Sequence, residues 1–309
     1  MNQASFNQPK STSPALLYTL IAIMVLLWSG NYIVAKVALR EIPPVLLMSL
    51  RMAVSGVLIL PFLIAELRRK RLSPNRRELG IWTALGLGGV MLNQFTFVLG
   101  ISRTTVTHSS MLIATGPVWV LLTASLLKME KVTIIKILGI STAIAGVAIL
   151  QIFRSKPTAN GPTVAGDLLI LLTAILFALM TVFSKRLRSK QVHPGSSAVV
   201  INSIGYIGGA FLLAPLGYLT APNFDFSTVS WAGWGGLLYM GAFSSVLCYL
   251  IYYWVLERMQ ASRIATYIYF QPFVATLLAV AILHEELTVP AMASGAVIFT
   301  GVFLTERFG

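Results

Sequence analysis

Two amide side chains stand in the middle of a long apolar segment of the chain. Asn93 and Gln94 are adjacent near the centre of residues 79–101. An amide in an apolar environment needs hydrogen-bond partners, because leaving it unpaired costs free energy. The partner is either a bound small molecule or a neighbouring helix. We predict that both residues bind a substrate, with helix packing as the alternative.

Aromatic hydroxyls and a further amide follow in the second half of the chain. Tyr249 and Tyr252 are three residues apart, and Tyr267 and Gln271 are four apart, so each pair shares one face of a helix. An aromatic wall with a few polar groups suits an amphipathic ligand. Aromatic residues also form belts at membrane interfaces. We predict that these four residues complete the substrate site.

Four charged residues lie within or at the ends of apolar segments, namely Lys36, Arg51, Asp167 and Lys185. We predict structural roles for all four. The two lysines end their segments, where long side chains extend toward the membrane surface. Arg51 lies deeper and needs a carboxylate or carbonyl partner, for which Glu41 and Asp167 are candidates.

Two prolines lie inside apolar segments, Pro117 and Pro272. Proline removes a backbone donor and bends a helix. The bends are either tolerated kinks or hinges, and we predict hinges because the two prolines occupy corresponding places in the two halves of the chain.

Residues for metal, cofactor or hydrolytic chemistry are not gathered in the sequence. The histidines and the single cysteine are scattered, at His108, His193, His284 and Cys248, and no phosphate-binding loop or nucleophile elbow occurs. We therefore predict no cofactor and no metal. His108 is expected at a solvated helix end, with proton coupling as the alternative. Glu130 and Glu285 are expected to stabilise the N-termini of the helices that follow them.

The elements that position these residues are membrane spans. Of the 309 residues, 56% are hydrophobic and only 11% are charged, against roughly 25% charged in soluble domains. The mean hydropathy is +0.80. Ten windows reach the roughly 20 apolar residues that a spanning helix needs, and they cover residues 15–37, 44–65, 79–101, 106–127, 132–152, 164–186, 196–220, 231–256, 262–282 and 287–306.

The net charge of +13 is a topology signal, because the basic residues cluster between spans. With the N-terminus in the cytoplasm, the loops rich in lysine and arginine lie inside. The densest of them, residues 66–77, carries six arginines and lysines. We predict cytoplasmic termini, a lipid bilayer and a small-molecule substrate as partners, and no nucleic acid. The oligomeric state stays open.

The two halves of the chain match one another. Pro117 and Gly146 correspond to Pro272 and Gly301 at an offset of 155 residues. Each half has five spans, an odd number, so the halves cross the membrane in opposite senses, as in secondary transporters. The predicted fold is an all-α polytopic membrane protein with two inverted five-helix repeats. A cytoplasmic tail covers residues 1–14, and the repeats cover 15–155 and 156–309.

The sequence resembles the EamA-type ten-helix members of the drug/metabolite transporter superfamily. The resemblance rests on Leu27-Trp28-Ser29-Gly30-Asn31 with Lys36, Arg51, Gly116-Pro117, Gly166-Asp167, Phe177-Ala178 with Ser184-Lys185, Gln271-Pro272, and the matched segments starting at Glu130 and Glu285. It implies a carrier of the bacterial inner membrane, often an exporter of amino acids or other metabolites. It also implies a central cavity between the third, fourth, eighth and ninth spans.

The predicted function is therefore secondary transport of small amphipathic metabolites, such as amino acids, by alternating access around a central cavity, without enzymatic activity. The resemblance alone favours export as the direction. The alternatives are a membrane-embedded enzyme that modifies lipids, a channel and a scaffold that transports nothing. Substrate, direction and energy coupling stay open.

Overall fold

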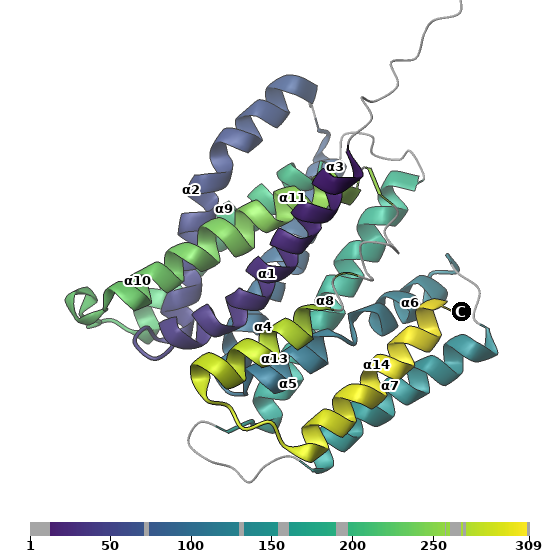
Figure 1. Ribbon diagram of the computed structural model, residues 1–309. Coiled ribbons are helices and arrows are strands. Elements are labelled where there is room, and N and C mark those ends of the chain that lie inside the picture. Colours follow the sequence, from purple (N-terminus) through teal and green to yellow (C-terminus); the bar gives the residue numbers. More distant parts are fainter. Residues whose placement is uncertain are drawn as a thin grey trace, which may run out of the picture.

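The computed structural model describes residues 13–70, 74–129, 133–153, 161–189, 197–256, 258–259, 267 and 270–307. The regular elements in these ranges are all helical (Figure 1). In the first half they are α1 Pro14–Ala38, α2 Pro44–Lys70, α3 Arg76–Ala84, η1 Leu85–Met91, α4 Leu92–Ile101, α5 Val106–Ile113, α6 Gly116–Leu126 and α7 Ile134–Ile152. In the second half they are α8 Val164–Ser189, α9 Ala198–Thr220, η2 Phe226–Thr228, α10 Trp231–Leu238, η3 Tyr239–Leu247, α11 Cys248–Leu256, α13 Phe270–Leu283 and α14 Val289–Arg307.

The length and composition of these helices confirm the predicted fold class. Eight helical segments of the described residues are long and apolar enough to span a membrane, and Phe270–Leu283 and Val289–Leu304 are shorter apolar helices. Large apolar side chains such as Leu126, Phe211 and Leu277 are exposed on the outer surface. Contact of such an apolar surface with lipid is favourable, whereas its exposure to water is not.

Short polar residues start several of the helices. Asn75 accepts a hydrogen bond from the Glu78 backbone, and the Glu78 carboxylate accepts one from the Asn75 backbone, which completes a capping box before α3. The hydroxyl of Thr105 accepts from the backbone at the start of α5, and that of Ser230 does so at the start of α10. These side chains satisfy backbone N–H groups that a helix leaves free at its start.

Two spans contain π-helical stretches at corresponding places. The third span runs through α3, η1 and α4, and the eighth through α10, η3 and α11, with η1 and η3 both π-helical. A π-helix widens the turn and interrupts the regular hydrogen-bond ladder, and it occurs often at functional sites. The matching positions agree with a repeat.

Corresponding spans also pack against one another. Helix α7 lies along α14 (Figure 1), and α2 lies along α9. A Cβ added to Gly146 would lie 3.0 Å from the carbonyl oxygen of Ser294, and one added to Gly301 would lie 2.6 Å from that of Gly139. Residues 139 and 294 are again 155 apart. The glycines let the two backbones approach closely.

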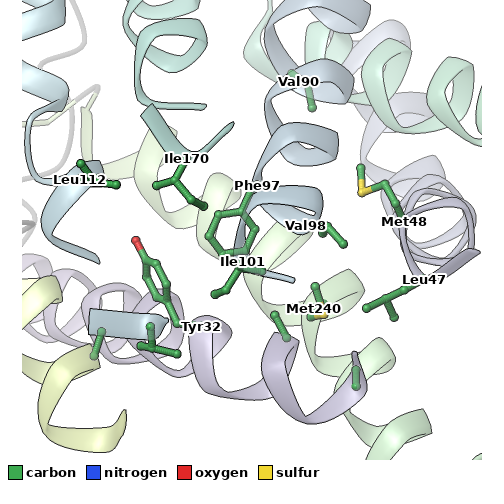
Figure 2. Close-up of a cluster of buried hydrophobic side chains, with 14 of the residues drawn as sticks. Tyr32, Leu47, Met48, Val90, Phe97, Val98, Ile101, Leu112, Ile170 and Met240 are labelled. Atoms are coloured by element: carbon green, nitrogen blue, oxygen red, sulfur yellow. The ribbon is translucent and has the colours of Figure 1, made fainter. Parts of the chain in front are cut away.

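One buried apolar cluster joins both halves. Figure 2 shows Tyr32 of α1 beside Phe97 of α4, with Leu112 of α5, Ile170 of α8 and Met240 of η3 around them. The rings of Tyr32 and Phe97 meet edge to face at 5.4 Å between centroids. The cluster thus fixes the spans that carry the predicted site residues.

Candidate functional site

The two adjacent amides have different surroundings. Asn93 is buried, and its Nδ2 atom donates to the carbonyl oxygen of Thr173 in α8 at 2.7 Å. A hydroxyl pair of Thr96 and Thr173, 2.8 Å apart, extends this contact. The contact between α4 and α8 therefore occupies the donor of Asn93, as the packing alternative requires.

Gln94 has no hydrogen-bond partner among the described residues. Its side chain is 6% exposed, and its polar atoms are not fully enclosed by the protein. A buried amide in this situation needs a ligand or water. Gln94 is thus better placed than Asn93 to bind a substrate.

Tyr249 and Tyr252 meet an aromatic residue of the first span. Their rings lie 5.7 Å and 6.0 Å from that of Trp28 in α1. The Trp28 Nε1 atom donates to the carbonyl oxygen of Ser244 at 3.2 Å, which fixes the indole against η3. The sequence analysis uses Trp28 only as one of the residues that carry the family resemblance. Its position beside Ser29 and Asn31 in an apolar span is a signal that could have indicated a role in substrate binding.

Gln271 also contacts the first span. The Nε2 atom of its side chain lies 3.4 Å from the hydroxyl of Tyr32. Its backbone carbonyl oxygen accepts a hydrogen bond from the hydroxyl of Ser29 at 3.1 Å. Both partners come from α1, which the expected cavity did not include. Tyr267, in contrast, is 36% exposed and lies 5.6 Å from Tyr18. No described contact joins it to Trp28, and its exposure suits an interfacial belt.

Both prolines lie inside their apolar segments, as predicted, but the helix of the fourth span is interrupted before Pro117. The fourth span breaks into α5 and α6 at Ala114–Thr115, so Pro117 lies in the first turn of α6 and not inside a continuous helix. Proline costs little there, because its missing N–H would have no partner. Pro272 lies near the start of the described part of α13. The hinge roles stay predictions.

The expected partner of Arg51 was wrong. Glu41 instead accepts two hydrogen bonds from Ser230, both at 2.7 Å. Asp167 accepts hydrogen bonds from Thr104 and from Gln151. The Nε atom of Arg51 donates to the Ser245 hydroxyl at 3.0 Å, because the side chain points from α2 toward η3.

Two further expectations were wrong at the same end of the molecule. His108 is buried, not solvated, and its Nδ1 atom lies 3.0 Å from a carboxylate oxygen of Asp167. Glu285 accepts the backbone N–H groups of Val106 and Thr107 at 2.7 Å and 3.0 Å. It therefore stabilises the N-terminus of α5, in the other half of the chain, and not that of α14.

The lysine that ends the first span belongs to the same region. Lys36 interacts electrostatically with Glu285 and with Arg40. The side chain of Lys185 and all of Glu130 lie outside the described residues. Among the residues that the structure describes, no three histidine, cysteine or acidic side chains gather as a metal site would require.

Several hydrogen bonds at this end of the molecule join the two halves of the chain. Glu285 binds Thr107, Asp167 binds His108 and Gln151, and Ser230 binds Glu41. The hydroxyl of Thr163 also donates to the carbonyl oxygen of Arg103 at 2.6 Å. We call these the outer contacts. They lie at the end of the molecule that the charge pattern predicts to face away from the cytoplasm.

Comparison with known proteins gives a consistent result. The model of the EamA-like transporter family matches residues 15–152 and 164–307. An "Uncharacterized transporter" of Archaeoglobus fulgidus is 26% identical over 93% of this chain and 96% of its own length. A "Probable amino-acid metabolite efflux pump" of Salmonella typhimurium is 24% identical over 92% of this chain and 93% of its own length.

A solved structure described only as "Crystal structure of protein" shares the fold. It has a TM-score of 0.60 and 18% sequence identity, and the match covers 96% of this chain and 98% of the other. The family model matches almost the whole chain, the relatives are named as transporters, and the structure has the required apolar helices. The chain therefore belongs to the EamA-like transporter family and is an integral membrane transporter, not an enzyme.

Proposed function

We propose that this protein is a secondary carrier that exports small amphipathic metabolites, such as amino acids, by alternating access. The name of the Salmonella relative supports amino-acid metabolites as the class and efflux as the direction. The inner membrane of a bacterium, with both termini in the cytoplasm, is the proposed location, and the bilayer and the small-molecule substrate are the proposed partners.

The outer contacts are the observation that carries this proposal. A carrier must close one end of its path and later open it. The outer contacts are hydrogen bonds between the halves, and they involve the ends of helices and the loops. Such bonds can exchange with water when the halves separate, because their net free energies are small. They support a state in which the outer end is closed.

The substrate site is proposed between the first, third, eighth and ninth spans. Gln94 supplies an amide without a described partner, and Gln271 donates only a long 3.4 Å hydrogen bond to Tyr32. Trp28, Tyr249 and Tyr252 supply an aromatic wall. Such a set suits a ligand with both an apolar body and polar groups.

Counterflow in proteoliposomes tests the function. The purified protein is reconstituted, the vesicles are loaded with one unlabelled amino acid or amine, and uptake of the labelled compound is measured. A carrier gives saturable uptake that the internal compound accelerates. Uptake without saturation indicates a channel. Absence of uptake for every compound, in protein with a cooperative thermal transition, contradicts the proposal and favours a scaffold.

A further inference from the structure

Arg51 is a buried cation within the second apolar span, helix α2. Arg51 is 1% exposed, and its side chain is the largest fully buried one among the residues that the structure describes. A charge within the hydrocarbon is costly unless it is paired, and such residues commonly mark substrate paths. The acids that could have paired with it, Glu41 and Asp167, are bound to Ser230 and to His108.

The partners that the structure describes for Arg51 are neutral. Its Nε atom donates to the hydroxyl of Ser245, and the carbonyl oxygen of Ser245 accepts the hydroxyl of Tyr206 at 2.7 Å. The Nη1 atom of Arg51 is buried without a hydrogen-bond partner among the described residues. A hydroxyl orients a guanidinium, but it does not balance a positive charge.

One residue of the aromatic wall, Tyr249, lies near the Arg51 side chain. Tyr249 follows Ser245 by four residues, and it is close enough to Arg51 for an electrostatic interaction. The ring of Tyr249 also meets that of Trp28 edge to face, with 5.7 Å between the centroids. Tyr249 therefore interacts with both Arg51 and Trp28, and Trp28 belongs to the aromatic wall on which an amphipathic ligand is proposed to bind.

We infer that Arg51 is the anion-binding group of the transport site and that it binds the carboxylate of the substrate, reached when the Tyr249 side chain moves. This inference rests on the proposed transport of small metabolites and narrows it to carboxylates. A planar guanidinium binds a carboxylate through two parallel hydrogen bonds, and this site has a free donor for it. The aromatic wall receives the apolar part of the same molecule.

The test compares an acid with its amide. Unlabelled L-leucine and L-leucinamide, and L-phenylalanine and L-phenylalaninamide, are compared as competitors of labelled amino-acid counterflow and as ligands that raise the thermal midpoint in detergent. The wild-type protein is expected to prefer the acids. Arg51→Gln should reduce the preference for acid over amide about tenfold or more, because a hydrogen bond to a charged group is lost. Arg51→Lys should keep part of it.

Ser55→Ala is the matched control. Ser55 lies one turn after Arg51 in α2 and donates to the carbonyl oxygen of Gly241 at 3.2 Å. Its loss weakens the same contact between α2 and η3 without touching the cation, so the acid preference should stay at the wild-type value.

Three results overturn the inference. One is an Arg51→Gln protein that weakens acid and amide equally, which indicates a structural role. Another is a wild-type protein that carries amines or amides but is neither stabilised nor inhibited by any acid, which removes the carboxylate site and leaves the carrier. Failure of all counterflow contradicts the proposed function itself, and the inference with it.

Discussion

At the residue scale, Asn93 and Gln94 show how neighbours in sequence receive different environments. They point in different directions from one helix, so only Asn93 meets the backbone of α8. Asn93→Ala should lower the free energy of unfolding by about 1 kcal/mol, the usual size of an interhelical hydrogen bond in membranes. The thermal midpoint in detergent measures this, with Thr96→Ala as a second variant at the same contact. An unchanged midpoint would contradict the packing role.

Gln94→Ala should act on transport and not on stability. We expect counterflow to fall about tenfold at low substrate concentration, a loss of about 1.4 kcal/mol of substrate or transition-state binding, with the thermal midpoint kept. Gln94→Glu is a second variant at this position, since it keeps the shape of the side chain and adds a negative charge. Normal counterflow in Gln94→Ala would remove this residue from the site.

Glu285 is the third residue with a testable role. Glu285→Gln weakens its bonds to the N-terminus of α5, because the carboxylate charge that favours a helix N-terminus is lost. The outer end should then open more often. The adjacent Glu286→Gln is the control, since Glu286 is exposed and takes no part in the outer contacts.

Accessibility measures this opening. In a Cys248→Ser background, Ser110→Cys places a thiol at a buried position of α5. Glu285→Gln should raise its labelling by an impermeant maleimide added outside severalfold, and Glu286→Gln should not. Equal labelling in all three proteins would show that Glu285 does not close the outer end.

At the element scale, the contact between α7 and α14 depends on small residues. Gly301→Ala should lower the free energy of unfolding by about 1–3 kcal/mol, as overpacking does, because the new Cβ would lie 2.6 Å from the carbonyl oxygen of Gly139. Gly146→Ala should cost a similar amount.

Gly80→Ala is the control for these two variants. Gly80 lies in α3, and a Cβ there meets nothing within 4 Å. Alanine is favoured over glycine in a helix by roughly 0.5–1 kcal/mol, so stability should hold or rise. A Gly301→Ala protein as stable as Gly80→Ala would mean that the two helices separate at little cost.

At the scale of the whole molecule, the outer contacts face away from the cytoplasm only if the chain has the predicted orientation in the membrane. The ten predicted spans would bring both termini to one face, and the basic loops predict that this face lies in the cytoplasm. A C-terminal green fluorescent protein should therefore fluoresce, and a C-terminal alkaline phosphatase should be inactive. The reverse result would place the outer contacts at the cytoplasmic end.

The spans, the family and the proposed topology follow from the amino-acid sequence without any coordinates. Apolar length and charge position act through transfer to lipid and do not depend on which helix lies beside which. The sequence also indicated residues such as Gln271 and Tyr249, because polar and aromatic groups in an apolar span need partners.

The partners of those residues, in contrast, depend on the packing of the helices. The sequence could not predict that Trp28 meets Tyr249, that Glu285 binds α5, or that Arg51 has no acid, because each contact joins segments more than 170 residues apart or depends on where an acid is already bound. Helix rotation and packing set these distances, and a small change of either moves a side chain to another neighbour.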